Sequence, residues 1–155
     1  MNKILFVCTG NQYRSPLAAA FFRWKLQQDG ISETWVVSSA GTWADSGTPV
    51  PTEVKSFARR MGLDLEDHVA SRVNESLLIS QDVILVMEVG HSEALRFEFP
   101  EMSDRIFLLS EVVDQVSYNI PDPLQDGRPY ATVAMELLVL IDRGYTEILR
   151  LADDG

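Results

Sequence analysis

The stretch KILFVCTGNQYRSP (residues 3–16) sets the start of the predicted fold. Residues 3–7 form an apolar run, as expected for a strand that is buried on both faces of a parallel sheet. After a short loop, Ser15-Pro16 begins a helix in a favoured way, because proline fits the first helical turn. Cys8 is therefore expected at the carboxyl end of a strand, and Arg14 where a helix begins.

The rest of the chain alternates segments that are typical of strands and helices. Further strands are expected at residues 34–41, 82–87 and 105–109. Helices are expected from residue 15 to about 29, and over about 52–61, 92–97 and 130–149. This alternation predicts an α/β domain with a parallel sheet and helices on both of its faces. Ligands of such folds bind at the carboxyl ends of the strands, where Cys8 is expected.

Apolar spacing predicts which helix faces are buried. In the first helix, the spacing i, i+4, i+7 selects Leu17, Phe21 and Trp24. In the last helix, the inward-facing residues are expected to be Val133, Leu137, Leu140 and Ile141.

Length and composition are those of one globular domain that spans residues 1–155. The chain is 46% apolar and 23% charged, which is ordinary for a globular protein and long enough for a sizeable core. Its longest apolar runs are too short to span a bilayer, and its first residues lack the pattern of a secretory signal. We therefore expect a cytoplasmic protein without a membrane partner.

One cysteine and a net charge of −10 exclude several classes of function. A lone cysteine can form neither an intrachain disulfide nor a cysteine-rich zinc site, and no metal is expected. The negative charge opposes binding to nucleic acid or anionic lipid, and we interpret it mainly as a contribution to solubility. An anion site in such a chain needs positive potential that is confined to its pocket.

The loop from Cys8 to Ser15 has the composition of such a pocket. Successive backbone N–H groups that curl around Gly10 can form an anion nest, which the positive end of the following helix reinforces. Arg14 can close the nest with a guanidinium fork that matches two phosphate oxygens. The same positive field favours the thiolate form of Cys8, and the Ser15 hydroxyl can donate a hydrogen bond to it.

Two interpretations of Cys8 compete. A lone cysteine is more often a small buried apolar residue than a reactive group. Glycine, arginine, serine and proline at these offsets instead favour a nucleophile that lies beneath a bound phosphoryl group and forms a phosphocysteine.

At this point the sequence resembles the low-molecular-weight protein tyrosine phosphatases. VCTGNQYRSP (7–16) is similar to the N-terminal loop of that family, and SSAGT (38–42), GLDLEDH (62–68), VILVM (83–87) and PDP (121–123) follow in the family's order. The resemblance covers essentially the whole chain. It implies a four-stranded, flavodoxin-like parallel sheet of the phosphotyrosine protein phosphatase I type.

The resemblance also implies roles for individual residues. It makes Cys8 the nucleophile, Arg14 the phosphate clamp and Ser15 the hydroxyl that stabilises the thiolate. Asn11 matches the asparagine that holds the unusual backbone of the loop, with Ser39 and His68 as its polar support. The phosphate-binding loop then comprises Thr9, Gly10, Asn11, Gln12, Tyr13, Arg14 and Ser15.

A general acid is needed as well, because the leaving oxygen must be protonated and water must then be activated. Asp122 lies between two prolines, which restrict its backbone, and its place in the family pattern makes it the expected acid. By itself, Asp-Pro is more often a turn. Asp126 is the nearest rival, but it precedes Gly127 and is more typical of a turn.

The sequence departs from the family pattern at several positions. Tyr13 stands where many members have a second loop cysteine, so no internal disulfide can protect the nucleophile. Leu124 and Gln125 stand where aromatic residues commonly form a wall beside the substrate, and Trp43 is a possible replacement for them. Packing is the alternative role of Trp43. Glu88 stands where an aspartate is usual.

We therefore expect a phosphatase that acts on phosphorylated proteins, with phosphotyrosine as the leading substrate and no metal or organic cofactor. Phosphoarginine is the first alternative, since some bacterial relatives prefer it. Arsenate reduction with an external thiol, and phosphoprotein binding without turnover, are weaker alternatives. A module that only binds phosphoproteins would not need Asp122 as a general acid. We expect a monomer or weak dimer.

Overall fold

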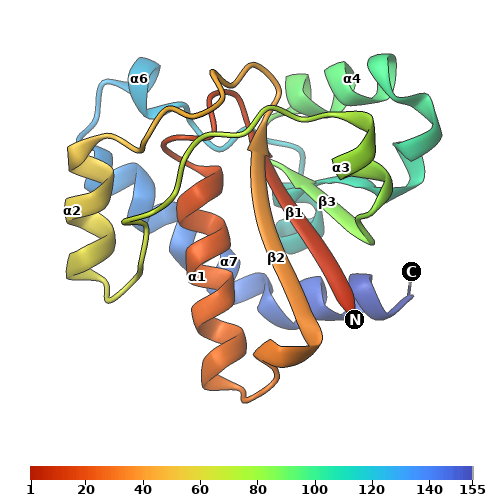
Figure 1. Ribbon diagram of the computed structural model, residues 1–155, viewed down its shortest axis with the longest axis horizontal. Helices are drawn as coiled ribbons and strands as arrows, with labels where there is room; N and C mark the ends of the chain where they lie inside the picture. The colour runs from red at the N-terminus through yellow and green to blue at the C-terminus, as the bar shows by residue number, and fades with distance from the viewer. Residues whose placement is uncertain (155) are drawn as a thin grey trace.

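The computed structural model describes residues 1–154, which form one parallel sheet with helices on both faces (Figure 1). The strand order is β2-β1-β3-β4, and each neighbouring pair is parallel. The strands are β1 (Asn2–Cys8), β2 (Trp35–Gly41), β3 (Val83–Val86) and β4 (Ile106–Leu108). The predicted α/β fold with four parallel strands is confirmed.

Strand β1 decides where a ligand can bind. Its first neighbour along the chain, β2, lies on one side, and the chain then crosses to β3 on the other side. Such a reversal opens a crevice at the carboxyl ends of the strands. Cys8 is the last residue of β1, so it lies at this crevice.

Alternate residues of β1 belong to two separate cores. Ile4 and Phe6 pack with α1 (Ser15–Gln28) and α7 (Tyr130–Asp154), whereas Leu5 and Val7 pack with α3 (Glu75–Ile79) and α4 (Val89–Glu98). The period of two follows from the opposite directions of successive side chains in a strand. Figure 1 shows α1 and α7 on one side of the sheet and α3 and α4 on the other. Burial on both faces explains why β1 is apolar throughout residues 4–8.

The remaining helices complete the layers. A third buried cluster joins α2 (Thr52–Arg60) to α1 and α7, and α5 (Leu109–Asp114) packs on α7. α6 (Pro123–Asp126) is a single turn in the loop that leads to α7. Two 3-10 helices, η1 (Ser32–Thr34) and η2 (Pro100–Arg105), precede β2 and β4.

The predicted strands and longer helices are present, with different ends. α4 begins at Val89 instead of about residue 92, and α7 ends at Asp154 instead of about residue 149. Three helices were not predicted, namely α3, α5 and α6, because segments of four to six residues show no helical periodicity. Helices α1 and α2 end within one residue of the predicted positions. Each end is followed two residues later by a glycine with positive φ, Gly30 after α1 and Gly62 after α2.

The predicted buried face of α1 was wrong at Trp24. Trp24 is 38% exposed and stacks on Phe21 at the surface, with ring centroids 5.9 Å apart. Phe22 and Leu26, which the prediction did not select, are fully buried against the sheet. The helix is covered on two sides, so its apolar surface is wider than one i, i+4, i+7 row. All four inward-facing residues predicted for α7 are buried.

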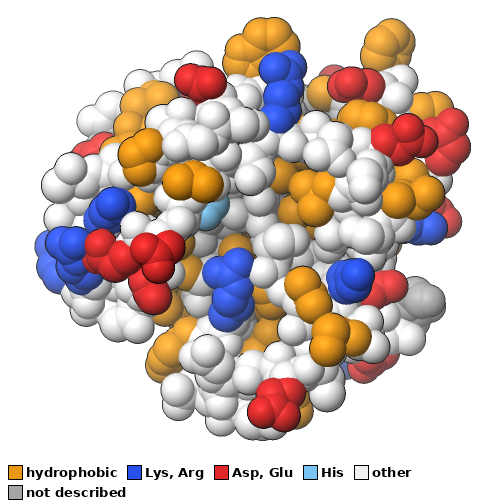
Figure 2. All heavy atoms as spheres, viewed as in Figure 1, with side chains coloured by type: hydrophobic (Ala, Val, Ile, Leu, Met, Phe, Trp, Pro, Cys, Tyr) orange, Lys and Arg blue, Asp and Glu red, His pale blue; other side chains and the backbone are white. Residues whose placement is uncertain are grey.

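Charges of both signs are mixed on the face of the molecule drawn in Figure 2. Arg59 and Glu66, near α2, form one of the exposed ion pairs, at 2.5 Å. None of the helices within residues 1–154 has both the length and the apolar character needed to cross a membrane.

Candidate active site

The loop between β1 and α1 surrounds a small cavity at the carboxyl end of the sheet. Cys8 is buried at its base, and the Cys8 sulfur lies 3.0 Å from Ser15 Oγ. The cavity has a volume of about 120 Å³. Its walls are formed by Cys8, Thr9, Gly10, Gln12, Tyr13, Arg14, Asp122 and Leu124. Five residues of the predicted phosphate loop, the nucleophile candidate and the acid candidate therefore meet at one place.

Asn11 holds the shape of the loop. It is fully buried and has a φ of 56°, in the left-handed region that asparagine tolerates better than most residues. Its side-chain amide donates to Ser15 Oγ (2.8 Å) and Ser39 Oγ (3.0 Å), and its Oδ1 accepts from the Ser71 N–H (2.9 Å). His68 Nε2 donates to the Asn11 carbonyl oxygen at 3.0 Å. A change in the conformation of the loop would break these bonds, so they stabilise its shape.

Sequence reasoning located the curl of the loop at Gly10 and missed Ser71. Gly10 is not among the residues with positive φ, so Asn11 makes the left-handed turn instead. Nothing in the sequence indicated that a backbone N–H from a distant loop reaches the Asn11 side chain. Gly41 adds a further constraint, because a Cβ there would collide with the Thr9 carbonyl oxygen and lie 3.0 Å from the Asn11 nitrogen.

The hydrogen bonds around Ser15 direct its proton. Because Asn11 donates to Ser15 Oγ, the hydroxyl proton is available to other acceptors. Those within reach are the Cys8 sulfur at 3.0 Å and the Ala40 carbonyl oxygen at 3.3 Å. A thiolate at Cys8 would therefore receive a hydrogen bond from Ser15.

Arg14 is held in place by the N-cap residue of α4 and by the loop before α6. It is only 3% exposed, and its Nη1 lies 2.6 Å from Glu88 Oε2 and 2.9 Å from the Ile120 carbonyl oxygen. Its Nη2 lies 3.4 Å from Thr9 Oγ1. One edge of the guanidinium is thus fixed by the protein. Sequence reasoning noted Glu88 only as a departure from the family pattern. Its place just after a strand that neighbours β1 could have indicated that its carboxylate lies near the site.

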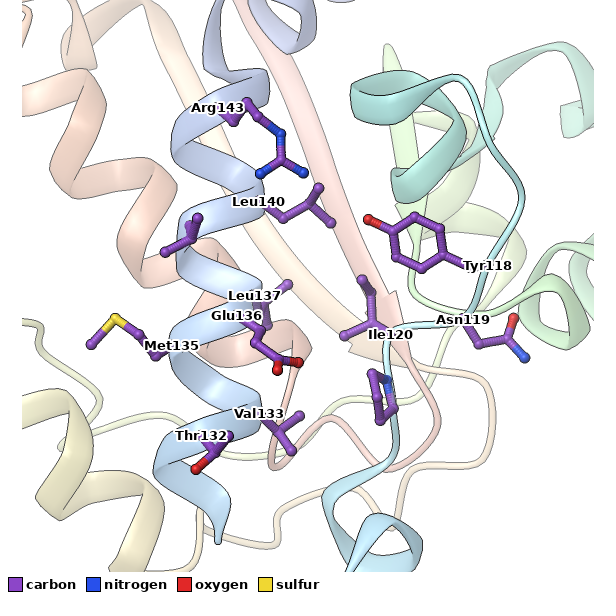
Figure 3. A pocket seen from close by; sticks show the side chains of 12 residues that line it. Tyr118, Asn119, Ile120, Thr132, Val133, Met135, Glu136, Leu137, Leu140 and Arg143 are labelled. Atoms are coloured by element: carbon purple, nitrogen blue, oxygen red, sulfur yellow. The ribbon is translucent and has the colours of Figure 1, made fainter. Parts of the chain in front are cut away.

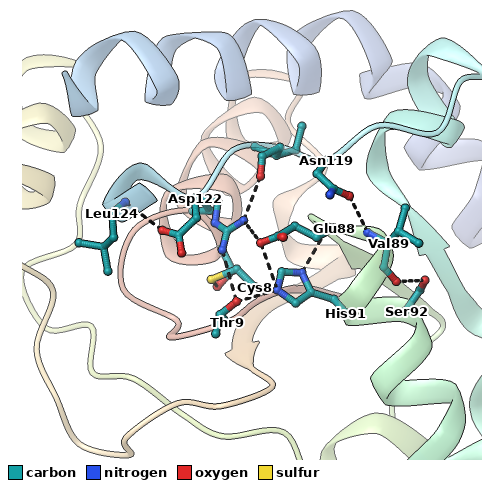
Figure 4. Close-up of polar contacts among 12 residues, drawn as sticks. Cys8, Thr9, Glu88, Val89, His91, Ser92, Asn119, Asp122 and Leu124 are labelled. Atoms are coloured by element: carbon teal, nitrogen blue, oxygen red, sulfur yellow. Dashed lines mark hydrogen bonds and ion pairs between the residues drawn. The ribbon is translucent and has the colours of Figure 1, made fainter. Parts of the chain in front are cut away.

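His91 of α4 lies beside Thr9 and Glu88 (Figure 4). His91 is 5% exposed, and burial, followed by the positive charge of Arg14, lowers its pKa to about 4. Burial also lowers the pKa of His68, with a smaller contribution from Arg23. Sequence reasoning did not select His91.

Asp122 reaches the cavity from the loop that precedes α6 (Figure 4). Its Oδ1 accepts the Leu124 N–H at 2.9 Å, so Asp122 caps this turn. The rival Asp126 is not among the cavity residues. It pairs with Arg128 at 2.5 Å, and these hydrogen bonds lower the pKa of its carboxyl group.

The walls of the cavity differ from the expected set. Tyr13 and Leu124 line it, whereas Trp43 and Gln125 are not among its lining residues. Trp43 is 73% exposed, and the Arg72 guanidinium lies 4.5 Å from its ring centroid. The alternative role of Trp43 in packing is therefore wrong. Tyr13 is half-buried, and its ring meets Tyr130 edge-on at 5.9 Å.

A larger apolar cavity of about 710 Å³ lies between α7 and residues 118–121 (Figure 3). Tyr118 and Ile120 face Leu137, Leu140 and Arg143 of α7 across it. Its lining is mostly apolar, with Glu136 and Arg143 as the charged residues, and it includes neither Cys8 nor Asp122. Within residues 1–154, no three His, Cys, Asp or Glu side chains are grouped so that they could hold a metal ion.

Known proteins resemble this chain over almost its whole length. Residues 3–149 match the model of the family described as low molecular weight phosphotyrosine protein phosphatase. The protein-arginine-phosphatase of Geobacillus stearothermophilus is 35% identical over 144 residues, which are 91% of this chain and 92% of that protein. The low molecular weight protein-tyrosine-phosphatase Wzb of Salmonella typhi is 32% identical over 154 residues, which are 99% of this chain and 97% of that protein.

A solved structure has the same fold. It is a YwlE arginine phosphatase mutant with a phosphorylated active site serine, and it shares 28% sequence identity with this chain. The TM-score is 0.87, and the match covers 96% of this chain and 99% of that one. Similarity in sequence and in fold therefore points to the same group of proteins.

Proposed function

Because the chain belongs to the low molecular weight phosphotyrosine protein phosphatase family, we propose that it hydrolyses phosphomonoesters through a covalent intermediate on Cys8. The family consists of cysteine-dependent hydrolases, and this chain is one of them, acting on phosphorylated proteins. The observation that carries the proposal is that Cys8, Arg14 and Asp122 line one cavity. Two distant parts of the sequence supply these residues, the loop from Cys8 to Arg14 and the segment that carries Asp122.

In the first step, the Cys8 thiolate attacks phosphorus and forms the S–P bond while the bond to the leaving oxygen breaks. Asp122 transfers its proton to that oxygen. Arg14 and the N–H groups of the loop stabilise the negative charge on the other phosphoryl oxygens. In the second step, the Asp122 carboxylate takes a proton from water, which attacks phosphorus and releases inorganic phosphate and the Cys8 thiolate.

The contacts of the site support these roles. Ser15 Oγ lies 3.0 Å from the Cys8 sulfur and has a proton to donate, which stabilises the thiolate both before attack and as leaving group. Glu88 and the Ile120 carbonyl hold one edge of Arg14, which leaves its other edge, at Nη2, toward Thr9 and the cavity. An arginine that is fixed before the substrate arrives stabilises developing charge without reorganisation.

Phosphotyrosine in proteins is the substrate that the walls favour. Tyr13 and Leu124 flank the cavity, and Tyr13 is braced by its edge-on contact with Tyr130 and by the bond from Tyr130 Oη to its carbonyl oxygen (2.7 Å). A rigid aromatic ring and an apolar side chain suit a flat aryl group between them. Tyr13 thereby takes the place of the aromatic residues missing at positions 124 and 125.

Phosphoarginine in proteins is the second candidate. It is favoured by the similarity to the protein-arginine-phosphatase of Geobacillus stearothermophilus. A guanidinium group is also planar and stacks on aromatic rings, so Tyr13 does not exclude it. Hydrolysis of matched peptides that carry phosphotyrosine, phosphoarginine or phosphoserine separates the candidates. A higher kcat/KM for the phosphoarginine peptide would replace the first candidate by the second.

The mechanism is tested with an aryl phosphate, the parent protein and three variants. Cys8→Ser is expected to abolish turnover, and Asp122→Ala to lower kcat about 10²- to 10⁴-fold, as is typical for loss of a general acid. Asp126→Ala is the matched control, because Asp126 lies in the same loop but pairs with Arg128. Full activity of Cys8→Ser, or an equal loss in both aspartate variants, would contradict the assignment. Arsenate with an external thiol, assayed in parallel, tests the reductase alternative.

A further inference from the structure

His91 is a buried imidazole to which the proposed mechanism gives no role. It lies on the first turn of α4, and its two ring nitrogens have different partners. Nδ1 lies 3.1 Å from the Glu88 backbone nitrogen, and Nε2 lies 2.8 Å from Thr9 Oγ1 and 3.6 Å from Glu88 Oε2 (Figure 4). Thr9 in turn lines the cavity above Cys8.

These partners determine where the ring proton is. A backbone N–H can only donate, so Nδ1 must accept and carries no proton. The proton of the neutral imidazole is then on Nε2. It is donated to Thr9 Oγ1, because Glu88 Oε2 at 3.6 Å is beyond hydrogen-bond distance. A doubly protonated ring would set an N–H against the Glu88 N–H, and burial beside Arg14 disfavours that form as well.

Thr9 Oγ1 therefore accepts hydrogen bonds, and its own proton must be donated to another group. Its two neighbours are His91 Nε2 at 2.8 Å and Arg14 Nη2 at 3.4 Å, and both are donors. A hydroxyl oxygen has two lone pairs and one proton. No carbonyl or carboxylate in the part of the chain that the structure describes accepts from Thr9 Oγ1. The direction that remains for the proton is the cavity.

We propose that His91 is a positioning residue, which orients the Thr9 hydroxyl as a hydrogen-bond donor to a phosphoryl oxygen in the cavity. The inference rests on the proposed function, because it takes the cavity for a phosphate site. Thr9 then adds a neutral donor to Arg14 and the loop N–H groups. His91 does not touch the substrate and acts through Thr9 alone.

A simpler role for His91 is to cap α4. Its Nδ1 and the Glu88 side chain form a reciprocal cap at the start of this helix. Capping contributes to stability but predicts no dependence on Thr9. The two roles are therefore separated by asking whether the effect of changing His91 disappears when Thr9 has no hydroxyl.

The experiment is a double-mutant cycle with Thr9→Val, His91→Phe and the double variant. The readouts are kcat/KM for an aryl phosphate, binding of inorganic phosphate by calorimetry, and the thermal midpoint. Each single variant is expected to lower kcat/KM about 10- to 100-fold, toward the range for loss of one oxyanion donor. The double variant is expected to match Thr9→Val, because His91 acts only through Thr9.

Two further variants complete the design. Thr9→Ser restores the hydroxyl and is expected to recover most of the loss of Thr9→Val. Ser92→Ala is the matched control in α4, since it removes the 2.8 Å bond to the Val89 carbonyl but does not contact Thr9, and parent activity is expected. Losses that multiply in the double variant, or parent behaviour of Thr9→Val, overturn the proposal.

The outcomes also separate the inference from the proposed function. If the parent turns over substrate but the cycle shows no coupling, only the role of His91 fails. If the parent does not turn over substrate but binds phosphate, coupled losses of phosphate binding in the same variants still support the role of His91. If the parent binds no phosphate, both proposals fail.

Discussion

At the scale of single residues, the shape of the loop depends on the hydrogen bonds of one buried side chain, Asn11. Asn11 bonds to Ser15, Ser39 and Ser71, and this allows a non-glycine residue to hold positive φ in a buried loop. Backbone strain of this kind persists only where the surroundings over-determine it. Each of these bonds joins residues from different elements, so the loop is only as well ordered as the fold around it.

The replacement of a second loop cysteine by Tyr13 has a consequence for oxidation. Cys8 is the only cysteine of the chain, so a sulfenic acid formed there has no internal thiol with which to form a disulfide. After treatment with peroxide and then dithiothreitol, the parent protein is expected to regain less activity than Tyr13→Cys. Tyr13→Ser is the matched control, because it removes the ring without adding a thiol. Equal recovery in all three proteins would contradict this prediction.

At the scale of elements, helix ends and strand ends bring the chemistry together. The end of β1 supplies Cys8, the N-cap of α4 supplies Glu88, and the turn α6 supplies Asp122 at its cap. Each position follows from the direction of the parallel strands, whose carboxyl ends share one edge. Ile120, which lies two residues before Asp122, is buried in the same cluster as Leu137 and Leu140 of α7.

Gly144 is a test of how closely α5 and α7 pack. Alanine is about 1 kcal/mol better than glycine inside a helix. At position 144, however, an added Cβ would collide with the Val113 side chain and lie 3.1 Å from its Cβ. Val113 is branched and cannot turn away easily, so overpacking of about 1–3 kcal/mol is expected to outweigh the gain.

The measurement is the free energy of unfolding in urea. Gly144→Ala is expected to be less stable than the parent, and the double variant with Val113→Ala is expected to recover part of the loss. A Gly144→Ala variant that is more stable than the parent would show that the two helices separate without cost.

At the scale of the whole molecule, the buried His91 is expected to make the free energy of unfolding depend on pH. Its pKa falls from 6.5 to about 4 on folding, because of burial and the charge of Arg14, against the opposing charges of Glu88 and Asp122. Between these values the unfolded chain binds more protons than the folded one. The free energy of unfolding therefore falls as the pH is lowered through this window.

One titrating group of this kind changes stability by about 1.4 kcal/mol per pH unit at most. Between pH 7 and pH 5, the parent is expected to lose about 2 kcal/mol more stability than His91→Gln, which has no proton to gain. Urea unfolding at the two pH values measures the difference. Parallel losses in both proteins would mean that His91 titrates in the fold as it does in the unfolded chain.

Much of the fold was predictable because local signals agreed with the final structure. The apolar run before Cys8 and the Ser15-Pro16 start act over a few residues, and both predictions are confirmed. Trp24 was misassigned because α1 is buried on two sides, which depends on where α2 and α7 pack. The short helices α3, α5 and α6 have no periodicity to detect.

The sequence by itself determined the order of elements and the spacing from Cys8 to Arg14 and Ser15, because these depend on neighbours along the chain. Only the tertiary structure decided which distant groups complete the site. The bonds from Glu88 to Arg14, from His91 to Thr9 and from the Ser71 N–H to Asn11 join elements through the strand order, not through the chain. Hydrogen bonds require contact within about 3 Å, and spacing along a chain cannot specify that for residues brought together only by folding.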